Sequence, residues 1–385
     1  MYKKGIIILL LISIFLPSIK VRADESLLQN AKSGLLMEVS TGKIIYEKNI
    51  HEKTSVASMT KMMGMVLIME ALEDGKIKLE DMVVVSRNAS GMGGSQIWLE
   101  EGEKISVLDL IKGIMMASAN DGIVAMAEYI GGTEANFVKM MNEKAKSLGL
   151  KDTNFVNPTG LDEKDHYSTA YDMALIAKEL ISHEEILKYT SIYEDYLRKG
   201  TDRQFWLVNT NKLIKTYQGA DGLKTGYTDA AMYCMAVTAK RNDMRLLAIT
   251  LGEKEGKVRN KETSELLDYG FNLYKVETIK KKGEELGTIS IDKADIPKIK
   301  IIANQDVTVL KNKNDKKEEY KSNVILNTLK LPIKEGDMIG KLVVKDSLGN
   351  MIDEVNITVA NDIKKDNYFN IFFKILKGVI IGNLF

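Results

Sequence analysis

Ser58-Met59-Thr60-Lys61 stands directly before the apolar run MMGMVLIMEAL, residues 62–72. Because this run is apolar on nearly every helical face, it predicts a helix buried in a large core. Ser58 then lies at the helix N-terminus, with Lys61 one turn further on the same side. The helix dipole and unpaired N–H groups favour an anion beside Ser58, and an apolar wall lowers the proton affinity of Lys61. The two residues are therefore a candidate nucleophile and base.

The Ser-x-x-Lys spacing alone does not identify a catalytic serine, because it also occurs at Ser40–Lys43 and Ser290–Lys293. The first of these lies in the turn of a predicted β-hairpin over residues 34–46. The second lies in a lysine-rich region with short β-like runs. We interpret both as non-catalytic.

Composition narrows the possible functions. The chain has 385 residues, enough for two domains, and its 54 basic and 53 acidic residues create no global basic field for nucleic acid. The single cysteine, Cys234, excludes intrachain disulfides, and its apolar β-like surroundings predict a core residue. The three histidines show no zinc-binding spacing, so we expect neither a metal nor another cofactor.

The N-terminus has the pattern of an export signal. Lys3 and Lys4 precede an apolar run over residues 5–17, and Val21-Arg22-Ala23 fits a small-x-small cleavage site. We therefore predict a signal peptide over residues 1–23 and export of the mature chain. An uncleaved membrane anchor is the alternative.

Two further motifs follow Ser58 in the chain. A predicted helix over residues 107–116 leads to Ser118-Ala119-Asn120, although a second Ser-x-Asn occurs at Ser86–Asn88. Lys224-Thr225-Gly226 precedes two predicted strands and is the chain's only Lys-Thr-Gly. It can present a cation and a hydroxyl to an anionic ligand, and Gly226 lets that ligand approach the backbone. A simple turn at a strand edge is the alternative.

The sequence changes character near residue 274. Short β-like runs predict a small all-β domain over residues 276–363. Residues 364–385 are rich in Phe, Ile and Leu, and polar residues recur there at helical spacing: Asn367, Asn370, Lys374 and Lys377. A spanning helix would bury two lysines at about 2.5–3.5 kcal/mol each. We therefore predict an amphipathic helix lying on the outer face of the cytoplasmic membrane; docking on its own protein is the alternative.

Together the three motifs and their surroundings, VASMTKMM, MMASANDG and DGLKTGYTD, resemble the active-site serine penicillin-recognising enzymes. Within these the chain is most similar to low-molecular-mass penicillin-binding proteins, the serine-type D-alanyl-D-alanine carboxypeptidases of peptidase family S11. The segments 157–161 and 166–170 also look like that family. The resemblance covers residues 35–273. It implies an α+β catalytic domain over residues 24–273, with an antiparallel sheet flanked by helices.

The resemblance also implies a role for each motif residue. Ser58 would attack the carbonyl between the two D-alanines of a peptidoglycan stem peptide, with Lys61 as general base. Ser118 would pass a proton toward the leaving amine, and Asn120 would bind the substrate backbone. Lys224 would strengthen the positive field that lowers the proton affinity of Lys61.

The substrate carboxylate would be bound by Thr225 and by Arg259, which lies where the family places a carboxylate-binding arginine. Backbone N–H groups of Ser58 and Tyr227 would form the oxyanion hole. Tyr227 stands where some members have histidine, so a backbone donor survives while the local pH response can differ. The resemblance further implies covalent inhibition by β-lactam antibiotics.

Two other functions stay open. A class A-type β-lactamase needs a carboxylate that activates the deacylating water, and Glu163 and Asp165 lie near a suitable region, although the appended β domain argues against this enzyme. A penicillin-binding sensor or wall-binding module would keep the pocket with little turnover. Such a protein would be acylated but would release almost no D-alanine.

Overall fold

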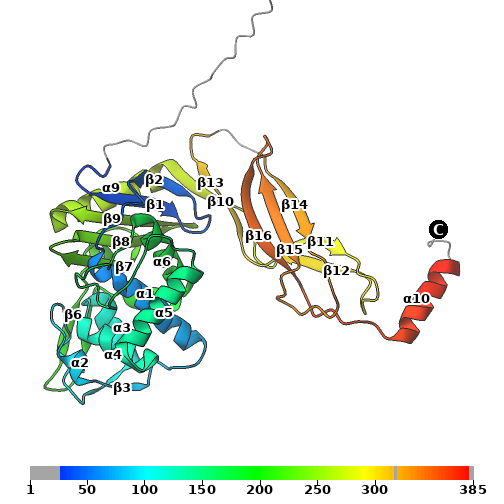
Figure 1. Ribbon diagram of the computed structural model, residues 1–385. Coiled ribbons are helices and arrows are strands. Elements are labelled where there is room, and N and C mark those ends of the chain that lie inside the picture. Colours follow the sequence, from blue (N-terminus) through cyan, green and yellow to red (C-terminus); the bar gives the residue numbers. More distant parts are fainter. Residues whose placement is uncertain (1–26, 316–318, 381–385) are drawn as a thin grey trace, which may run out of the picture.

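The computed structural model describes residues 27–315 and 319–380. These form two lobes, a larger one of helices around a sheet and a smaller one of strands, with helix α10 (Tyr368–Ile380) at the far end (Figure 1). The predicted signal peptide lies outside the described residues. The observed fold is α+β, as predicted.

The larger lobe is built on a five-stranded antiparallel sheet with the order β2-β1-β9-β8-β7. Its strands are β1 (Ser33–Glu38), β2 (Ile44–Lys48), β7 (Ala220–Thr228), β8 (Met232–Arg241) and β9 (Met244–Glu253). Helix α9 (Gly256–Leu273) packs on one face, and α6 (Ala170–Ser182) packs on the other. Because both faces are covered, β8 and β9 are buried along most of their length. Strand β7 forms one edge of the sheet.

Helix α1 (Lys61–Glu73) lies in the middle of the helical part, and every residue from Met62 to Met69 is buried. This confirms the prediction of an enclosed helix. Each large apolar side chain there contributes about 1.5–3 kcal/mol by leaving water. The helices that pack against it are α4 (Asn120–Gly131), α5 (Glu134–Ser147) and α6, and α3 (Val107–Met116) packs on α4. Lys61 is thus held at the start of a fully enclosed helix.

Shorter elements complete the larger lobe: the 3-10 turn η1 (Ala57–Thr60), α2 (Arg87–Ser90), α7 (Glu185–Thr190), α8 (Leu213–Thr216), the pair β3 (Met82–Val84) and β4 (Lys104–Ser106), and the hairpin β5 (Glu194–Leu197) and β6 (Phe205–Val208). The sequence did not predict the β5–β6 hairpin. Each of its strands has only four residues, too few to show a clear alternation.

The smaller lobe contains a two-stranded sheet of β10 (Tyr274–Lys280) and β13 (Val307–Asn312), and a five-stranded sheet of β11 (Glu285–Ile289), β12 (Ile299–Ala303), β16 (Met351–Val359), β15 (Gly340–Lys345) and β14 (Lys321–Leu326). Val355, Ile357 and Val359 are buried, as their spacing predicted. Ser40 and Thr308 join the two lobes by a hydroxyl–hydroxyl hydrogen bond of 3.0 Å. Ser40 itself lies in the β1–β2 turn, which confirms its predicted position outside the Ser58–Lys61 pair.

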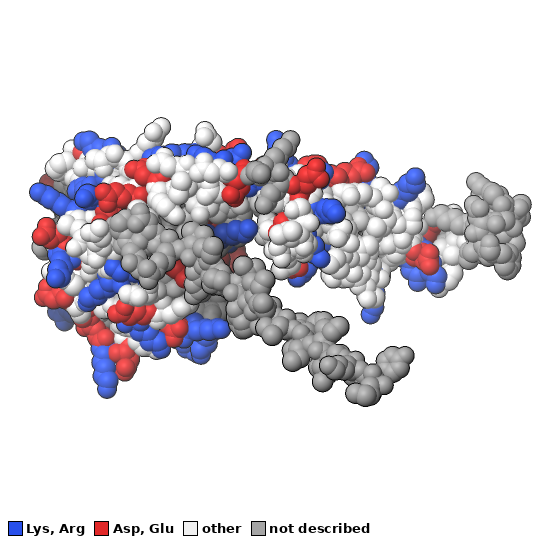
Figure 2. All heavy atoms as spheres, turned by 90° about the horizontal axis from the view of Figure 1, so that it is seen from above, with Lys and Arg blue, Asp and Glu red and all other residues white. Residues whose placement is uncertain are grey.

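Charge is mixed over the surface, and Lys/Arg and Asp/Glu side chains alternate across the face shown in Figure 2. Helix α10 exposes Tyr368, Phe369, Phe372, Phe373 and Leu376. Among the described residues, no helix has both the length and the apolar character needed to cross a membrane.

Candidate active site

Ser58 lies in η1, the single 3-10 turn that leads into α1, rather than in the α-helix itself. A tighter turn of this kind is common at a helix start. The preceding residue, Ala57, has a φ of 48°, in the left-handed region. Two glycines lie against this turn: a Cβ on Gly160 would collide with the Ala57 carbonyl, and a Cβ on Gly226 would lie 3.0 Å from the Ser58 nitrogen. The backbone of Ser58 is therefore clamped from two sides.

Lys61 is fully buried and binds three oxygen atoms through Nζ. These are Ser58 Oγ at 2.9 Å, Asn120 Oδ1 at 2.6 Å and the Thr159 carbonyl oxygen at 2.6 Å. Burial, followed by the positive charge of Lys224, holds the pKa of Lys61 well below its ordinary value. Compared with an exposed lysine, Lys61 therefore favours the neutral amine, the form that can accept a proton.

The geometry around a neutral Lys61 fixes the direction of its lone pair. The Thr159 carbonyl can only accept a hydrogen bond. Asn120 also offers its oxygen to Lys61, because its Nδ2 donates to the Gly93 carbonyl at 2.7 Å and so sets the amide orientation. These two acceptors bind both N–H groups of the amine. The lone pair is left facing Ser58 Oγ, where it can accept the serine proton.

Ser118 lies between α3 and α4, with a φ of 64° that turns the chain sharply after the buried end of α3. Lys224 Nζ donates to Ser118 Oγ at 2.9 Å and to the Thr225 carbonyl at 2.7 Å. Burial, followed by the charge of Arg259, lowers the pKa of Lys224 to about 7. The structure thus places a second serine–lysine pair within electrostatic range of the first.

Lys224, Thr225 and Gly226 lie within β7. They precede β8 and β9, as predicted, whereas the alternative of a simple turn at a strand edge is wrong. Because β7 is an edge strand, the side of it away from β8 is available to the site. Thr225 Oγ1 donates to Thr210 Oγ1 at 2.7 Å. Tyr227 is 53% exposed, and its ring lies 4.4 Å from the ring of Tyr233.

Arg259 extends from α9 to the backbone of β8. It is buried, and Nη1 donates to the Cys234 carbonyl at 3.3 Å while Nη2 donates to Asn260 Oδ1 at 2.8 Å. Burial lowers its pKa to about 10, so it remains positive at neutral pH. Cys234 is fully buried, and burial raises its pKa to about 11. This confirms Cys234 as a core residue rather than a nucleophile.

His166 stabilises η1, the nucleophile turn that carries Ser58, through a hydrogen bond to Thr60. Its Nδ1 accepts the Val156 N–H at 3.2 Å, so Nε2 carries the proton and donates to Thr60 Oγ1 at 2.8 Å. Burial lowers the pKa of His166 to about 4, and the ring stays neutral at physiological pH. His166 therefore positions the turn and does not compete with Lys61 for a proton.

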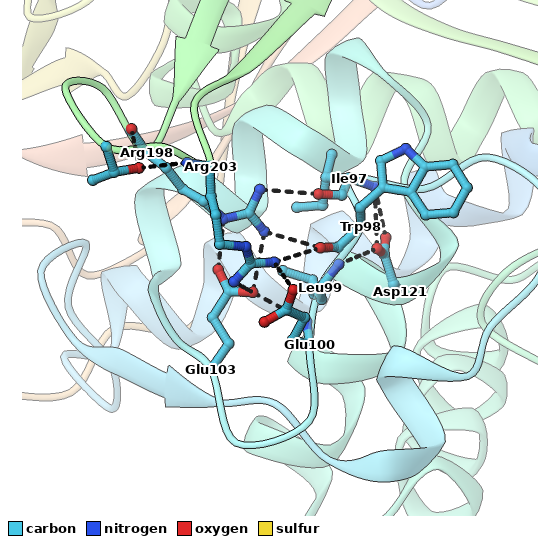
Figure 3. A network of polar contacts seen from close by, with 9 residues as sticks. Ile97, Trp98, Leu99, Glu100, Glu103, Asp121, Arg198 and Arg203 are labelled. Carbon is cyan, nitrogen blue, oxygen red and sulfur yellow. Dashed lines mark hydrogen bonds and ion pairs between the residues drawn. The ribbon is translucent and has the colours of Figure 1, made fainter.

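The segment over residues 93–99 borders the site and is tied to α4. Asn120 N–H donates to the Ser95 carbonyl at 2.7 Å. The Asp121 carboxylate accepts the N–H groups of Ile97 at 3.1 Å and Leu99 at 3.0 Å (Figure 3). The position of Asn120 is thereby coupled to the conformation of this segment.

Two arginines from the β5–β6 hairpin hold the same segment from the other side. Arg198 Nη1 donates to the Ile97 carbonyl at 3.1 Å, and Arg203 Nη2 donates to the Trp98 carbonyl at 3.0 Å. Glu103 binds both guanidinium groups, at 2.6 Å and 3.1 Å (Figure 3). These contacts could not be predicted from the sequence, since they depend on a hairpin about 100 residues further along the chain.

One group in the described residues has the composition of a metal site. Ligand atoms of Glu70, Glu179 and His183 lie within 4.8 Å of one another. The Lys144 ammonium already binds both carboxylates, at 2.5 Å and 2.7 Å. A lysine thus supplies the positive charge that a cation would bring.

Comparison with known proteins places this geometry in a family. Residues 20–255 match the peptidase S11 family, described as D-alanyl-D-alanine carboxypeptidase, and residues 274–365 match the C-terminal domain of penicillin-binding protein 5. D-alanyl-D-alanine carboxypeptidase DacF of Bacillus subtilis (strain 168) is 45% identical over 359 residues, which cover 92% of each chain.

Solved structures agree with this assignment. Penicillin-binding protein 5 from Haemophilus influenzae superposes with a TM-score of 0.72 and 32% identity, covering 87% of this chain and 98% of that chain. Ampicillin-bound penicillin-binding protein D2 from Listeria monocytogenes gives a TM-score of 0.57 and 33% identity, covering 63% and 97%. The fold is therefore that of the penicillin-recognising enzymes, and this chain belongs to the family of serine D-alanyl-D-alanine carboxypeptidases.

Proposed function

We propose that this protein removes the terminal D-alanine from peptidoglycan stem peptides through an acyl-enzyme on Ser58. The observation that carries the proposal is the bonding of Lys61, whose two N–H groups are taken by Asn120 Oδ1 and the Thr159 carbonyl. Its lone pair is thereby directed at Ser58 Oγ, 2.9 Å away. A buried, neutral lysine in this position is a general base for a serine nucleophile.

In the acylation step, Ser58 Oγ attacks the carbonyl carbon between the two D-alanines while Lys61 takes its proton. Backbone N–H groups of Ser58 and Tyr227 stabilise the oxyanion. As the C–N bond breaks, Ser118 passes a proton to the departing amine of D-alanine. Lys224, bonded to Ser118 Oγ, assists this transfer. Water then hydrolyses the ester and releases the shortened stem peptide.

The terminal carboxylate of the substrate binds at the β7 edge. Thr225 offers a hydroxyl there, and Lys224 and Arg259 supply positive charge from buried positions. Loss of Arg259 should therefore weaken substrate binding and raise KM more than it lowers kcat.

The test is D-alanine release from diacyl-L-Lys-D-Ala-D-Ala by the mature chain, beside Ser58→Ala. We expect release by the parent and none by the variant. Absence of release from the parent would contradict the proposal. Penicillin acylation and turnover would then separate a sensor, which keeps a long-lived adduct, from a β-lactamase, which clears it.

β-Lactam antibiotics are covalent ligands of this site, acylating Ser58. Support comes from the ampicillin-bound form of the related Listeria protein. Efficient β-lactam hydrolysis is not expected, because Glu163 and Asp165, the carboxylates that a lactamase reading would need, are exposed to solvent. Labelling by a fluorescent penicillin should be lost in Ser58→Ala.

The mature chain works outside the cytoplasm, attached by its C-terminal helix to the membrane surface. The pattern of residues 1–23 supports export, and the exposed aromatic residues of α10 support burial of one helix face among headgroups. Full-length mature chain should sediment with anionic vesicles, whereas a chain ending at Asn361 should stay in solution and keep its activity. Continued sedimentation of the shortened chain would contradict α10 as the anchor.

A further inference from the structure

Asp162 is a carboxylate that bridges two segments of the active site. Its Oδ1 accepts hydrogen bonds from Ser55 Oγ and from Thr228 Oγ1, each at 2.8 Å. Ser55 lies three residues before Ser58, and Thr228 is the last residue of β7, directly after Tyr227. One charged oxygen thus joins the segment of the nucleophile to the strand that carries the Lys-Thr-Gly motif. Hydrogen bonds to a charged acceptor are about twice as strong as those between neutral groups.

The turn that presents Asp162 is fixed by its own side-chain bonds. Asn157 Oδ1 accepts the Gly160 N–H at 2.8 Å and the Thr159 hydroxyl at 2.9 Å. Asn157 Nδ2 donates to the Leu161 carbonyl at 3.0 Å. The backbone is therefore closed on itself just before Asp162. A carboxylate on a turn of this kind has a fixed position, so its two bonds also fix the distance between their donors.

The end of β7 needs such an anchor because β7 is an edge strand. Among the described strands only β8 pairs with it, and Thr228 forms the last pair before the chain turns into β8. On the other side of β7, a Cβ on Gly226 would lie 3.0 Å from both the Ser58 nitrogen and the Val56 carbonyl oxygen. This contact is one attachment of β7 to the nucleophile turn, and the Asp162 bridge is a second, two residues further along β7. One attachment leaves a hinge, whereas two fix both distance and angle.

Tyr227 lies between these two attachments. Its N–H and the N–H of Ser58 are the two proposed oxyanion donors, and they come from different segments of the chain. Their common aim at one oxygen atom therefore depends on how β7 is held against the nucleophile turn. Such donors stabilise a transition state when they are already aimed before the charge develops. A displacement of about 1 Å in an active site can cost about 100-fold in rate.

We infer that Asp162 is a positioning residue, which holds the Ser58 and Tyr227 N–H groups at the spacing that the oxyanion requires. Asp162 acts through Ser55 and Thr228 rather than on the substrate. The inference rests on the proposed function and adds a residue that the three motifs do not contain. Because an amide oxygen can accept the same two hydrogen bonds, the role depends on the acceptor atom more than on its charge.

The test measures acylation of the mature chain by penicillin, with the dissociation constant of the first complex separated from the acylation rate constant. Asp162→Ala should lower the rate constant about 10- to 30-fold, a smaller loss than the roughly 100- to 1,000-fold for removal of one oxyanion donor. The dissociation constant should stay within about threefold, because the oxyanion charge develops only in the covalent step. Asp162→Asn should keep the rate constant within about threefold of the parent. The control is Glu163→Ala, which removes the exposed carboxylate next in the chain and should change neither constant.

A double-mutant cycle tests the bridge itself. Ser55→Ala removes one of the two donors and should slow acylation about 3- to 10-fold in the parent. In the Asp162→Ala background the same change should cost less than about twofold, because the shared acceptor is already gone. Ser55 is preferred to Thr228 for this cycle, since Thr228 Oγ1 also accepts the Ala231 N–H at 3.1 Å. Losses that simply multiply would show that Ser55 and Asp162 act independently and would overturn the inference.

Three further results would overturn it. The first is an unchanged acylation rate constant in Asp162→Ala. The second is an equal loss in Asp162→Asn, which would assign the effect to charge. The third is a matching loss of affinity for penicillin, which would show a general distortion of the pocket. If the parent itself were not acylated, the proposed function would fail, and the inference with it.

Discussion

Replacing Glu253 by glutamine should make the larger lobe more stable at alkaline pH. Glu253 is fully buried at the end of β9, and neither carboxylate oxygen finds a donor at normal hydrogen-bond geometry in the described chain. Its neighbour Glu262 on α9 is held by Asn30, with Nδ2 at 2.5 Å. Burial and the Glu262 carboxylate raise the pKa of Glu253 to about 8, from an ordinary 4.5.

The sign and size of the effect follow from proton linkage. Between pH 4.5 and pH 8 the folded protein holds a proton on Glu253 that the unfolded chain releases, so the free energy of unfolding falls as pH rises through this window. A pKa difference of about 3.5 corresponds to an upper limit of about 5 kcal/mol. Relaxation of the folded protein around the ionised carboxylate reduces this limit, and we expect about 2–5 kcal/mol. Glutamine preserves shape and removes the titration.

The assay is denaturant unfolding followed by tryptophan fluorescence, because Trp98 and Trp206 both report on the larger lobe. At pH 8, the free energy of unfolding of Glu253→Gln should exceed that of the parent by about 2–5 kcal/mol. At pH 5 the two free energies should agree within about 1 kcal/mol. The control is Glu255→Gln, an exposed glutamate two residues on. If the difference in free energy of unfolding between Glu253→Gln and the parent stayed constant from pH 5 to pH 8, the reasoning would be refuted.

Three shorter predictions concern the site. Gly226→Ala should slow penicillin acylation at least about tenfold with the fold intact, because the new Cβ, 3.0 Å from the Ser58 nitrogen, forces the two backbones apart; an unchanged acylation rate would contradict this. Lys224→Gln removes a positive charge that lowers the pKa of Lys61. The midpoint of the rising limb in a plot of acylation rate against pH should therefore move to higher pH. An unmoved midpoint would show that Lys224 does not influence the pKa of Lys61. Cys234, with a pKa of about 11, should react with a thiol reagent only after unfolding; rapid labelling of the native protein would show that the core is open there.

The sequence predicted the elements with strong local signals. The unbroken apolar run of α1, the helix over residues 107–116 and the β-rich C-terminal lobe all have such signals, and the structure contains each of them. The three short motifs, separated by about 60 and 100 residues, meet because η1 packs on β7 and α1 packs on α4. Motif identity, rather than periodicity, predicted this convergence.

Other parts of the site had no signal in the sequence. Thr159 binds Lys61 through its backbone carbonyl. Because every residue has a backbone carbonyl, the type of residue at this position does not predict the contact. Thr210 joins Thr225 by a hydroxyl contact across 15 residues of chain. The Lys-Thr-Gly segment lies inside β7, and the missing side chain of Gly226 leaves room there for the backbone of Ser58. These features depend on tertiary packing alone.

The two glycines that clamp the nucleophile turn restrict how this enzyme can evolve. Gly160, with a φ of +80°, and Gly226 both touch backbone rather than movable side chains, so a larger residue at either position must displace the Ser58 turn itself. Lineages under selection thus have almost no viable single-step change at the centre of the site. Change is left to residues that do not contact this turn, and even residues 93–99 at the margin of the site stay coupled to Asn120 through Ser95 and Asp121.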